Sequence, residues 1–212
     1  MEVWKTHIPE SLLSKYEIYN FNHAVEILSQ AYTSEYTDII AALETFSLTT
    51  SDLLAGGGNE STIPKKLSAL LRQNEWQEVK ITGDLLLSLE YRNPTGSTRQ
   101  TIENFIGGHN IDYVKNRIAI EMEWNSKDQT FDRDLFAFRT FYEYDIISCG
   151  IIITRSVQLN PVFETLGIKA KYGASTTWMG KLLPRIHSGR HGGCPLMVVG
   201  ITPNVITDWE GK

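Results

Sequence analysis

The stretch NIDYVKNRIAIEMEW, from Asn110 to Trp124, decides the fold. It contains two runs of strand-forming residues, Asn110–Val114 and Arg117–Trp124. Between them lies Lys115-Asn116, a loop of the length that joins two antiparallel strands. The sequence therefore predicts a β-hairpin.

Apolar and polar side chains alternate along the second strand of this hairpin. Its even-numbered residues are apolar, whereas its odd-numbered residues include Glu121 and Glu123. Because alternate side chains point to opposite faces, we expect the even face in the core and both carboxylates on the other face. With Lys115-Asn116 as a two-residue loop, Asp112 pairs with Ala119 and is the diagonal neighbour of Glu121.

Three carboxylates on one sheet face repel each other unless a cation compensates them. Mg²⁺ is held by few carboxylates together with phosphate oxygens, so the cluster favours a Mg²⁺ site and phosphodiester hydrolysis. The alternative is a solvated polar face in which the acidic residues have no chemical role.

The rest of the chain predicts an α/β protein, with a mixed central β-sheet flanked by helices in a single domain over residues 1–212. We expect helices after the capping residue Asn22, over Tyr36–Phe46, from Thr62, over Phe131–Tyr144 and near Trp178–Ile186. We expect further strands at Tyr16–Tyr19, Glu78–Thr82, Leu85–Tyr91, Cys149–Thr154 and Pro195–Ile201. The stretches Gly56–Asn59 and Asn93–Ser97 have the composition of loops, and we expect DNA to order the first.

Composition narrows the functional class. The chain has 212 residues and only two cysteines, which favours a reducing cytoplasm. No run approaches ~18 apolar residues, and no secretory signal is visible, so we expect no membrane partner. The glycine spacing from Gly173 to Gly180-Lys181 is too long for a phosphate loop, and Leu182 replaces its Ser/Thr, so we expect no nucleotide cofactor.

The net charge of −5 hides a segregation of charge along the sequence. From Arg155 to Gly200 the sequence has six basic residues and one acidic residue, Glu164. This segment therefore has a net charge of +5, and the remainder of the chain has −10. A basic segment beside an acidic cluster suits a salt-sensitive DNA enzyme that requires a divalent cation. We call residues 155–193 the basic region.

Four stretches together resemble a known family of nucleases. They are FNHAVEIL (Phe21–Leu28), NIDYVKNRIAIEMEW (Asn110–Trp124), GIIITRS (Gly150–Ser156) and LLPRIHSGRHGGCPLMVVGITP (Leu182–Pro203). In order and spacing this set resembles the PD-(D/E)xK nucleases, and more narrowly the type II restriction endonucleases of the BglII, BstYI and BamHI type. The resemblance implies a restriction-endonuclease-like core with its catalytic hairpin at residues 110–124.

The resemblance also implies roles for the acidic residues. Asp112 and Glu121 would bind Mg²⁺ with the Met122 carbonyl. The third motif position is Glu123, as in BamHI, where most of the superfamily has Lys and BglII-like members have Gln. Glu123 would orient or deprotonate the attacking water, or join the metal ligands. Glu78 would supply the upstream acidic residue, with an exposed strand-end Glu as its alternative interpretation.

Two segments and two arginines are implied to contact double-stranded DNA. The residues are Asn125, Ser126, Lys127 and Asp128 after the active strand, Lys169, Lys171, Ser175, Thr176 and Thr177 in a second loop, and Arg185 and Arg190. Members of the family cut both strands of a palindrome with a GATC centre, which implies a homodimer through Phe131–Tyr144 and products with 5′-phosphate ends. The alternatives are a nicking or repair nuclease of the same superfamily, and a DNA-binding protein without catalysis.

Overall fold

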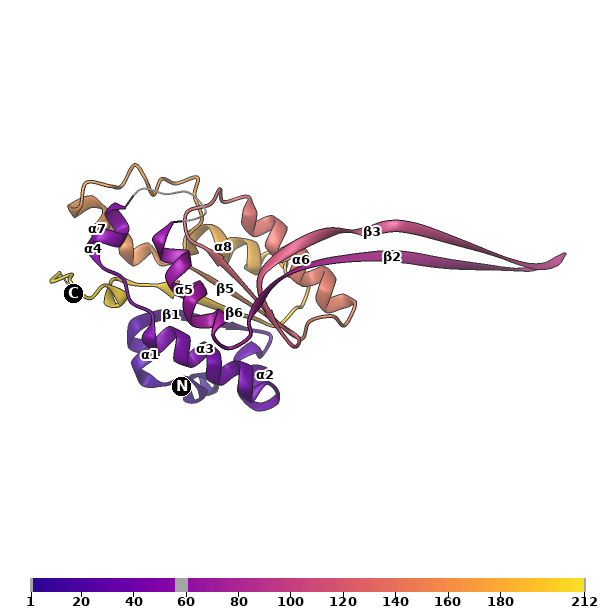
Figure 1. Ribbon diagram of the computed structural model, residues 1–212, viewed down its shortest axis with the longest axis horizontal. Helices are drawn as coiled ribbons and strands as arrows, with labels where there is room; N and C mark the ends of the chain where they lie inside the picture. The colour runs from indigo at the N-terminus through magenta and orange to yellow at the C-terminus, as the bar shows by residue number, and fades with distance from the viewer. Residues whose placement is uncertain (1, 56–60, 212) are drawn as a thin grey trace.

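A six-stranded mixed sheet organises the chain, in a computed structural model that describes residues 2–55 and 61–211 (Figure 1). The strand order is β1-β6-β5-β4-β3-β2. The strands are β1 (Tyr16–Phe21), β2 (Gln77–Arg92), β3 (Thr95–Lys115), β4 (Ile118–Glu123), β5 (Cys149–Arg155) and β6 (Leu196–Ile201). Strands β4, β5 and β6 run parallel, and the other neighbours pair antiparallel. The predicted α/β class is confirmed.

Helices cover both faces of this sheet. The α-helices are α1 (Glu10–Lys15), α2 (Ala24–Ala31), α3 (Thr33–Thr45), α4 (Thr50–Leu54), α5 (Thr62–Arg72), α6 (Thr130–Glu143), α7 (Asn160–Thr165) and α8 (Met179–His187). Three short 3₁₀ turns, η1 (Val3–His7), η2 (Val157–Leu159) and η3 (Pro203–Val205), complete the elements. One buried cluster joins the sheet to helices α1 to α5 and α7, and a second joins it to α6 and α8.

The central strands follow the sequence pattern closely. Every residue of β4, β5 and β6 is buried, as expected for strands with helices on both faces. The crossover helix α6 begins and ends within one residue of its predicted bounds. The cysteines Cys149 and Cys194 are both buried and free. Within the described residues, no helix is long and apolar enough to cross a membrane.

Two predictions differ from the structure at the N-terminal side. Helix α2 begins at Ala24 after His23, whose φ of 62° is left-handed, so Asn22 is not its cap. The Asn20 side chain instead accepts the Val25 N–H at 3.0 Å. The Gly56–Asn59 stretch, for which we expect ordering by DNA, lies outside the described residues.

Strand β2 joins two strands that the sequence predicted separately, Glu78–Thr82 and Leu85–Tyr91, and β3 is much longer than its predicted strand. Together they form a two-stranded ribbon that projects from the body (Figure 1). They pair from Arg92 opposite Thr95 down to Gln77 opposite Val114, with register shifts on either side of Gly83. Only Asn93-Pro94 forms the turn at the tip, so the predicted loop over 93–97 is wrong beyond its first two residues. Exposed apolar side chains along the ribbon are Leu86, Leu89, Tyr91, Ile102 and Phe105.

Candidate active site

The turn between β3 and β4 sets the register of the acidic residues. Lys115 pairs with Ile118, and Val114 pairs with Ala119, so the turn is Asn116-Arg117 and the predicted Lys115-Asn116 loop is wrong by one residue. Asn116 has a left-handed φ of 50°, a conformation that asparagine tolerates better than most residues. In this register the residue opposite Asp112 lies two positions further along β4 than predicted.

Asp112 therefore lies beside Glu121 rather than opposite Ala119. Its backbone N–H donates to Glu121 Oε2 at 3.3 Å, and its own Oδ2 accepts the Met122 N–H at 3.1 Å. The first contact joins the β3 backbone to the Glu121 carboxylate, and the second joins the Asp112 carboxylate to the β4 backbone. The two predicted metal ligands are thus closer neighbours than the diagonal arrangement implied.

The acidic face of β4 is buried. The exposed fractions of Glu121 and Glu123 are 2% and 5%, because α6 packs across this face. The solvated polar face is therefore wrong. Glu123 Oε2 has no hydrogen-bond partner among the described residues, which leaves a buried carboxylate oxygen with an unused acceptor.

Burial and mutual repulsion shift the acidities of this cluster. Burial, followed by the charges of Asp134 and Asp112, raises the pKa of Glu121 well above its ordinary value. Burial is also the main cause that raises the pKa of Glu123 and of Asp112, where the charge of Glu78 adds to it. Raised carboxyl pKa values of this kind, beside a cleft, are typical of functional sites.

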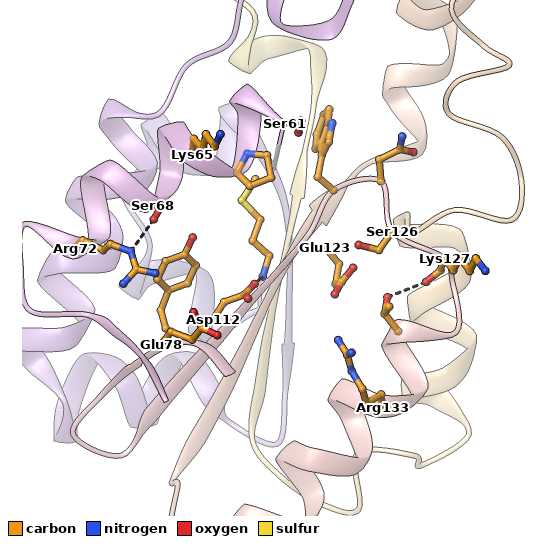
Figure 2. Close-up of a pocket in the computed structure, with 16 residues that line it drawn as sticks. Ser61, Lys65, Ser68, Arg72, Glu78, Asp112, Glu123, Ser126, Lys127 and Arg133 are labelled. Carbon is orange, nitrogen blue, oxygen red and sulfur yellow. Dashed lines mark hydrogen bonds between the residues drawn. The ribbon is translucent and has the colours of Figure 1, made fainter. Parts of the chain in front are cut away.

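A cleft of about 720 Å³ opens onto the cluster between β3, β4, α5 and α6 (Figure 2). Asp112, Met122 and Glu123 line it. Glu78, at the start of β2, is exposed and lines the same cleft, so the structure brings this predicted residue to the other acids. We call Glu78, Asp112, Glu121 and Glu123 the cleft carboxylates.

The donors of this site fit a hard divalent cation. The carboxylates of Asp112, Glu121 and Glu123 and the Met122 carbonyl are oxygen ligands of the kind that Mg²⁺ prefers. The unused Glu123 oxygen and the raised pKa values of Asp112 and Glu123 indicate that the described protein groups stabilise negative charge poorly at this place. Four basic residues line the cleft at its sides, where a phosphodiester would enter: Lys65, Arg72, Lys127 and Arg133.

Two residues beside Glu121 were not predicted as part of the site. His109 Nε2 lies 3.1 Å from Glu121 Oε1 and 3.8 Å from Asp134 Oδ1, and the ligand atoms of all three lie within 4.8 Å of one another. Burial, followed by the charge of Arg133, lowers the pKa of His109 to about 4. Burial, followed by the charge of Glu123, raises the pKa of Asp134 to about 8.

A sequence signal existed for one of these two residues. Asp134 falls on the buried stripe of α6 that also carries Phe131, Leu135 and Phe138, so it is an acidic residue at a core position. His109 gave no such signal, because the sequence predicts a strand that begins only at Asn110. Its place depends on the unpredicted length of β3.

The two segments expected to contact DNA are joined by backbone hydrogen bonds. Thr177 N–H donates to the Ser126 carbonyl at 2.9 Å, and Asp128 N–H donates to the Ser175 carbonyl at 3.0 Å. Lys127 and Thr176 form an isolated antiparallel bridge between these contacts. Of these two segments, Asn125, Ser126 and Lys127 line the cleft. The exposed Ser175 lies beside them through the Asp128 contact.

Other residues of the second loop are placed less favourably for DNA contact. The Thr177 side chain is buried, which does not agree with direct base or phosphate contact. The Lys171 ammonium donates to the carbonyls of Leu53, at 2.9 Å, and Ala55. Lys169 pairs with Glu164 on the surface, and Thr176 Oγ1 accepts a hydrogen bond from Arg155.

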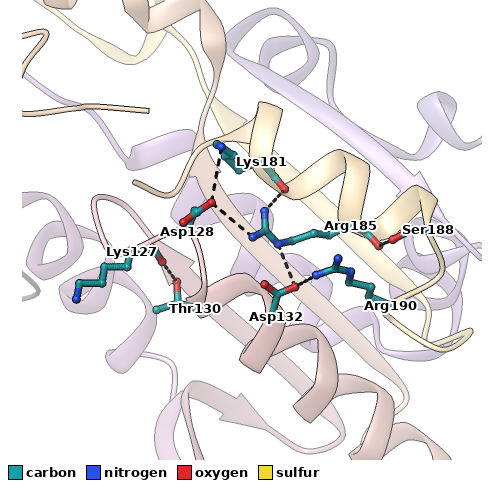
Figure 3. A network of polar contacts seen from close by, with 8 residues as sticks. All are labelled: Lys127, Asp128, Thr130, Asp132, Lys181, Arg185, Ser188 and Arg190. Atoms are coloured by element: carbon teal, nitrogen blue, oxygen red, sulfur yellow. Dashed lines mark hydrogen bonds and ion pairs between the residues drawn. The ribbon is translucent and has the colours of Figure 1, made fainter. Parts of the chain in front are cut away.

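Arg185 and Arg190 form an ion-pair network with α6 and the segment before it (Figure 3). Arg185 Nε lies 3.0 Å from Asp132, and its Nη2 lies 3.5 Å from Asp128. Arg190 also pairs with Asp132, and Lys181 lies 3.8 Å from Asp128. We call these five residues the α6–α8 ion-pair cluster.

Comparison with known proteins connects this geometry to a family. No curated protein matches the chain significantly. Residues 16–201 match the family model described as restriction endonuclease BglII/BglIII, which covers all six strands and the whole cleft. The chain therefore belongs to the BglII/BglIII family of restriction endonucleases and is a type II restriction endonuclease, an enzyme that hydrolyses DNA.

Proposed function

We propose that this enzyme is a Mg²⁺-dependent homodimer, built from one domain per chain and acting in the cytoplasm. It cuts both strands of a short palindrome with a GATC centre and leaves 5′-phosphate ends. The observation that carries the metal-dependent chemistry is the acidic group at the cleft: Glu121 and Glu123 are buried, Asp112 and Glu123 line a cleft with basic sides, and one Glu123 oxygen has no partner among the described residues. The palindrome and its centre rest on the resemblance to BglII, BstYI and BamHI.

Asp112 and Glu121 hold the cation in this proposal, together with the Met122 carbonyl. The Glu121 carboxylate accepts the Asp112 backbone N–H at 3.3 Å, and the Asp112 carboxylate accepts the Met122 N–H at 3.1 Å, so both acidic side chains are held at the β3–β4 pair. A divalent cation supplies, when bound, electrostatic stabilisation of the charge that develops on the phosphate. Glu78, on the neighbouring strand β2, lines the same cleft beside Asp112 and is the further acidic residue.

Glu123 acts on the attacking water in this proposal. Its Oε2 accepts no hydrogen bond within the described residues and lines the cleft, so it is free to accept one from water. The raised pKa of Glu123 brings its basicity closer to neutral pH, where a general base is most effective. Burial is the main cause of that shift.

The cleft rim holds DNA in this proposal. Asn125, Ser126 and Lys127 lie where β4 leads into α6, directly beside Glu123, so they can contact bases near the scissile phosphate. Arg133 lies across the same opening and suits phosphate contact. Arg185 and Arg190 contribute positive charge while they are held by Asp128 and Asp132.

The dimer interface in this proposal lies on α6. Phe136 and Tyr144 are 68% and 54% exposed, which is unusual for large aromatic side chains. They line an apolar groove of about 440 Å³ between α6 and β3, together with Phe105. A two-fold axis beside this groove gives each strand of a palindrome its own cleft.

Digestion of a fully sequenced viral genome in Mg²⁺, with mapping of every end, tests the activity, the target and the cut position together. We expect discrete fragments whose ends share one palindrome and carry 5′-phosphates, and no fragments with Glu121→Ala. Intact DNA from the wild-type enzyme across a broad panel of sequences would contradict the nuclease assignment of this chain.

Sedimentation of Phe136→Ser tests the interface. We expect the wild-type chain to sediment as a dimer and the variant to shift towards a monomer that nicks supercoiled plasmid more than it linearises it. A wild-type monomer that makes double-strand breaks would contradict the homodimer.

A further inference from the structure

We infer that His109, supported by Asp134, is a positioning residue that fixes the Glu121 carboxylate for metal binding. The inference rests on the proposed function of Glu121 as a metal ligand. It assigns a role to two residues outside the acidic motif, one from β3 and one from α6. The main observation that supports it is the contact of His109 Nε2 with Glu121 Oε1 at 3.1 Å.

A buried carboxylate depends on protein groups for its orientation. Glu121 is 2% exposed, so bulk water cannot hold its oxygens in place. Among the described residues, each oxygen contacts one hydrogen-bonding partner: Oε2 accepts the Asp112 N–H at 3.3 Å, and Oε1 contacts the His109 ring. The backbone donor fixes one end of the group, and His109 fixes the other.

The His109 ring is itself well placed for this task. Its side chain is 12% exposed, and the ring stacks at a tilt against Phe141 of α6, with centroids 6.5 Å apart. The same Nε2 lies 3.8 Å from Asp134 Oδ1, too far for a hydrogen bond but close enough for electrostatic attraction. With its proton on Nε2, the ring donates to Glu121 and lies next to Asp134.

Asp134 is the second acidic neighbour of the His109 ring. Its side chain is fully buried, and its Oδ2 has no hydrogen-bond partner among the described residues. Its Oδ1 pairs with Arg133 at 3.4 Å. Without the His109 N–H, Glu121 Oε1 would lose its one hydrogen-bonding partner among the described residues, and the Asp112 N–H alone would hold the carboxylate. Loss of such orienting contacts to metal ligands typically costs about 10–100-fold in metal affinity.

The test uses two substitutions at residue 109 in the full-length enzyme. His109→Leu removes the donor at similar volume, and His109→Gln restores an N–H at similar reach. The measurements are Ca²⁺ affinity and stoichiometry by titration calorimetry, and the Mg²⁺ concentration that gives half-maximal DNA cleavage. His7→Gln, at a position in the distant η1 turn, is the matched control.

We expect His109→Leu to weaken Ca²⁺ binding by about 10–100-fold and to raise the half-maximal Mg²⁺ concentration by a similar factor. His109→Gln should recover most of both, and the number of bound ions should stay the same. Asp134→Asn should have a smaller effect in the same direction. If His109→Leu does not fold, His109→Asn replaces it, because its shorter amide does not reach Glu121.

Three results would overturn the inference. Metal affinity within twofold of wild type in a folded His109→Leu enzyme would remove His109 from this role. Equal loss in His109→Leu and His109→Gln would show that the imidazole does more than donate, and loss of one bound ion in both would show that it is a ligand. Failure of the proposed function is distinct, because the wild-type enzyme itself would then neither bind Ca²⁺ nor cut DNA.

Discussion

Asp132 and Asp134 are two residues apart on α6, yet their environments have opposite effects on their acidity. Burial alone would raise the pKa of Asp132, but Arg185 and Arg190 lower it below its ordinary value. Asp134 points to the sheet, where burial and the charge of Glu123 raise its pKa to about 8. Asp134 has Arg133 as a cation partner at 3.4 Å, but burial outweighs it. The same helix thus carries one acid whose arginine partners lower its pKa and one whose burial raises it.

The comparison extends to the two clusters that flank this helix. Within the α6–α8 ion-pair cluster the carboxylates already have protein cations as partners, so the cluster is complete without a ligand. The cleft carboxylates have Arg133 as a nearby cation and one carboxylate oxygen without a partner. The difference teaches that an acidic cluster indicates a metal site when its carboxylates are buried with few cationic partners from the protein.

The largest expected effect is on cleavage, and it belongs to the cleft. Glu123→Gln keeps the size and hydrogen bonding of the side chain but removes its ability to accept a proton. We expect the rate of DNA cleavage at saturating Mg²⁺ to fall by about 10²–10⁴-fold, with DNA binding in Ca²⁺ largely retained. Glu10→Gln, at an exposed position on α1, should cut like wild type. Wild-type rates in Glu123→Gln would remove this residue from the chemistry.

The second effect is stabilisation by a cation. Ca²⁺ should raise the free energy of unfolding by about 2.7 kcal/mol at a concentration 100 times its dissociation constant, because the folded site alone binds it. Thermal unfolding with and without chelator measures this. Glu121→Gln should show little of the increase. An increase that persists in Glu121→Gln and disappears in Asp132→Asn would reverse the assignment of the two clusters.

The third effect belongs to the ion-pair cluster. Arg185→Ala removes a partly buried guanidinium that pairs with both Asp128 and Asp132. We expect the free energy of unfolding to fall by about 2 kcal/mol, since two carboxylates lose a charged partner. Lys169→Ala, which breaks the exposed pair with Glu164, should cost below about 1 kcal/mol in the same denaturation experiment. Equal costs would mean that burial does not distinguish these pairs.

The smallest effect is a pH dependence of the metal-free enzyme. The folded pKa of Asp134, about 8, lies above that of the unfolded chain, so the folded state keeps a proton that the unfolded state has lost. Stability should therefore fall as pH rises between about 4 and 8, by at most ~1.4 kcal/mol from pH 6 to 7. Asp134→Asn should make this dependence shallower, and the raised pKa values of Glu121, Glu123 and Asp112 account for what remains. Asp132→Asn should not, because a lowered pKa contributes only in more acidic solution. Denaturant titrations at several pH values compare the three chains.

Strand alternation made most of the active site predictable. The spacing of Asp112, Glu121 and Glu123 predicted three neighbouring acids, and the structure places Asp112 beside Glu121 and lines the cleft with Asp112 and Glu123. The register differed because either Lys115-Asn116 or Asn116-Arg117 can form a two-residue turn, and the left-handed Asn116 selects the second. No local pattern separates these choices.

The parts that the sequence did not predict depend on tertiary packing. Burial of Glu121 requires α6 to lie across the sheet, and His109 enters the site only because β3 extends beyond the predicted strand. The Arg185 and Arg190 side chains were predicted as phosphate ligands, a role that stays a prediction. Their pairing with Asp132 joins segments more than 50 residues apart, which no local spacing reveals.

The two ends of strand β3 lie in very different environments, one at the tip of the β2–β3 ribbon and one in the body. Near the tip, residues such as Leu89 and Thr98 pair only with the opposite strand of the ribbon, whereas Tyr113 is buried in the body. An isolated two-stranded hairpin is at best marginally stable, so the tip opens at low cost while the root opens only with the whole fold. Amide hydrogen exchange should therefore slow progressively along β3 from the tip to the root. The strand is then most rigid in the part that places His109 and Asp112 in the active site.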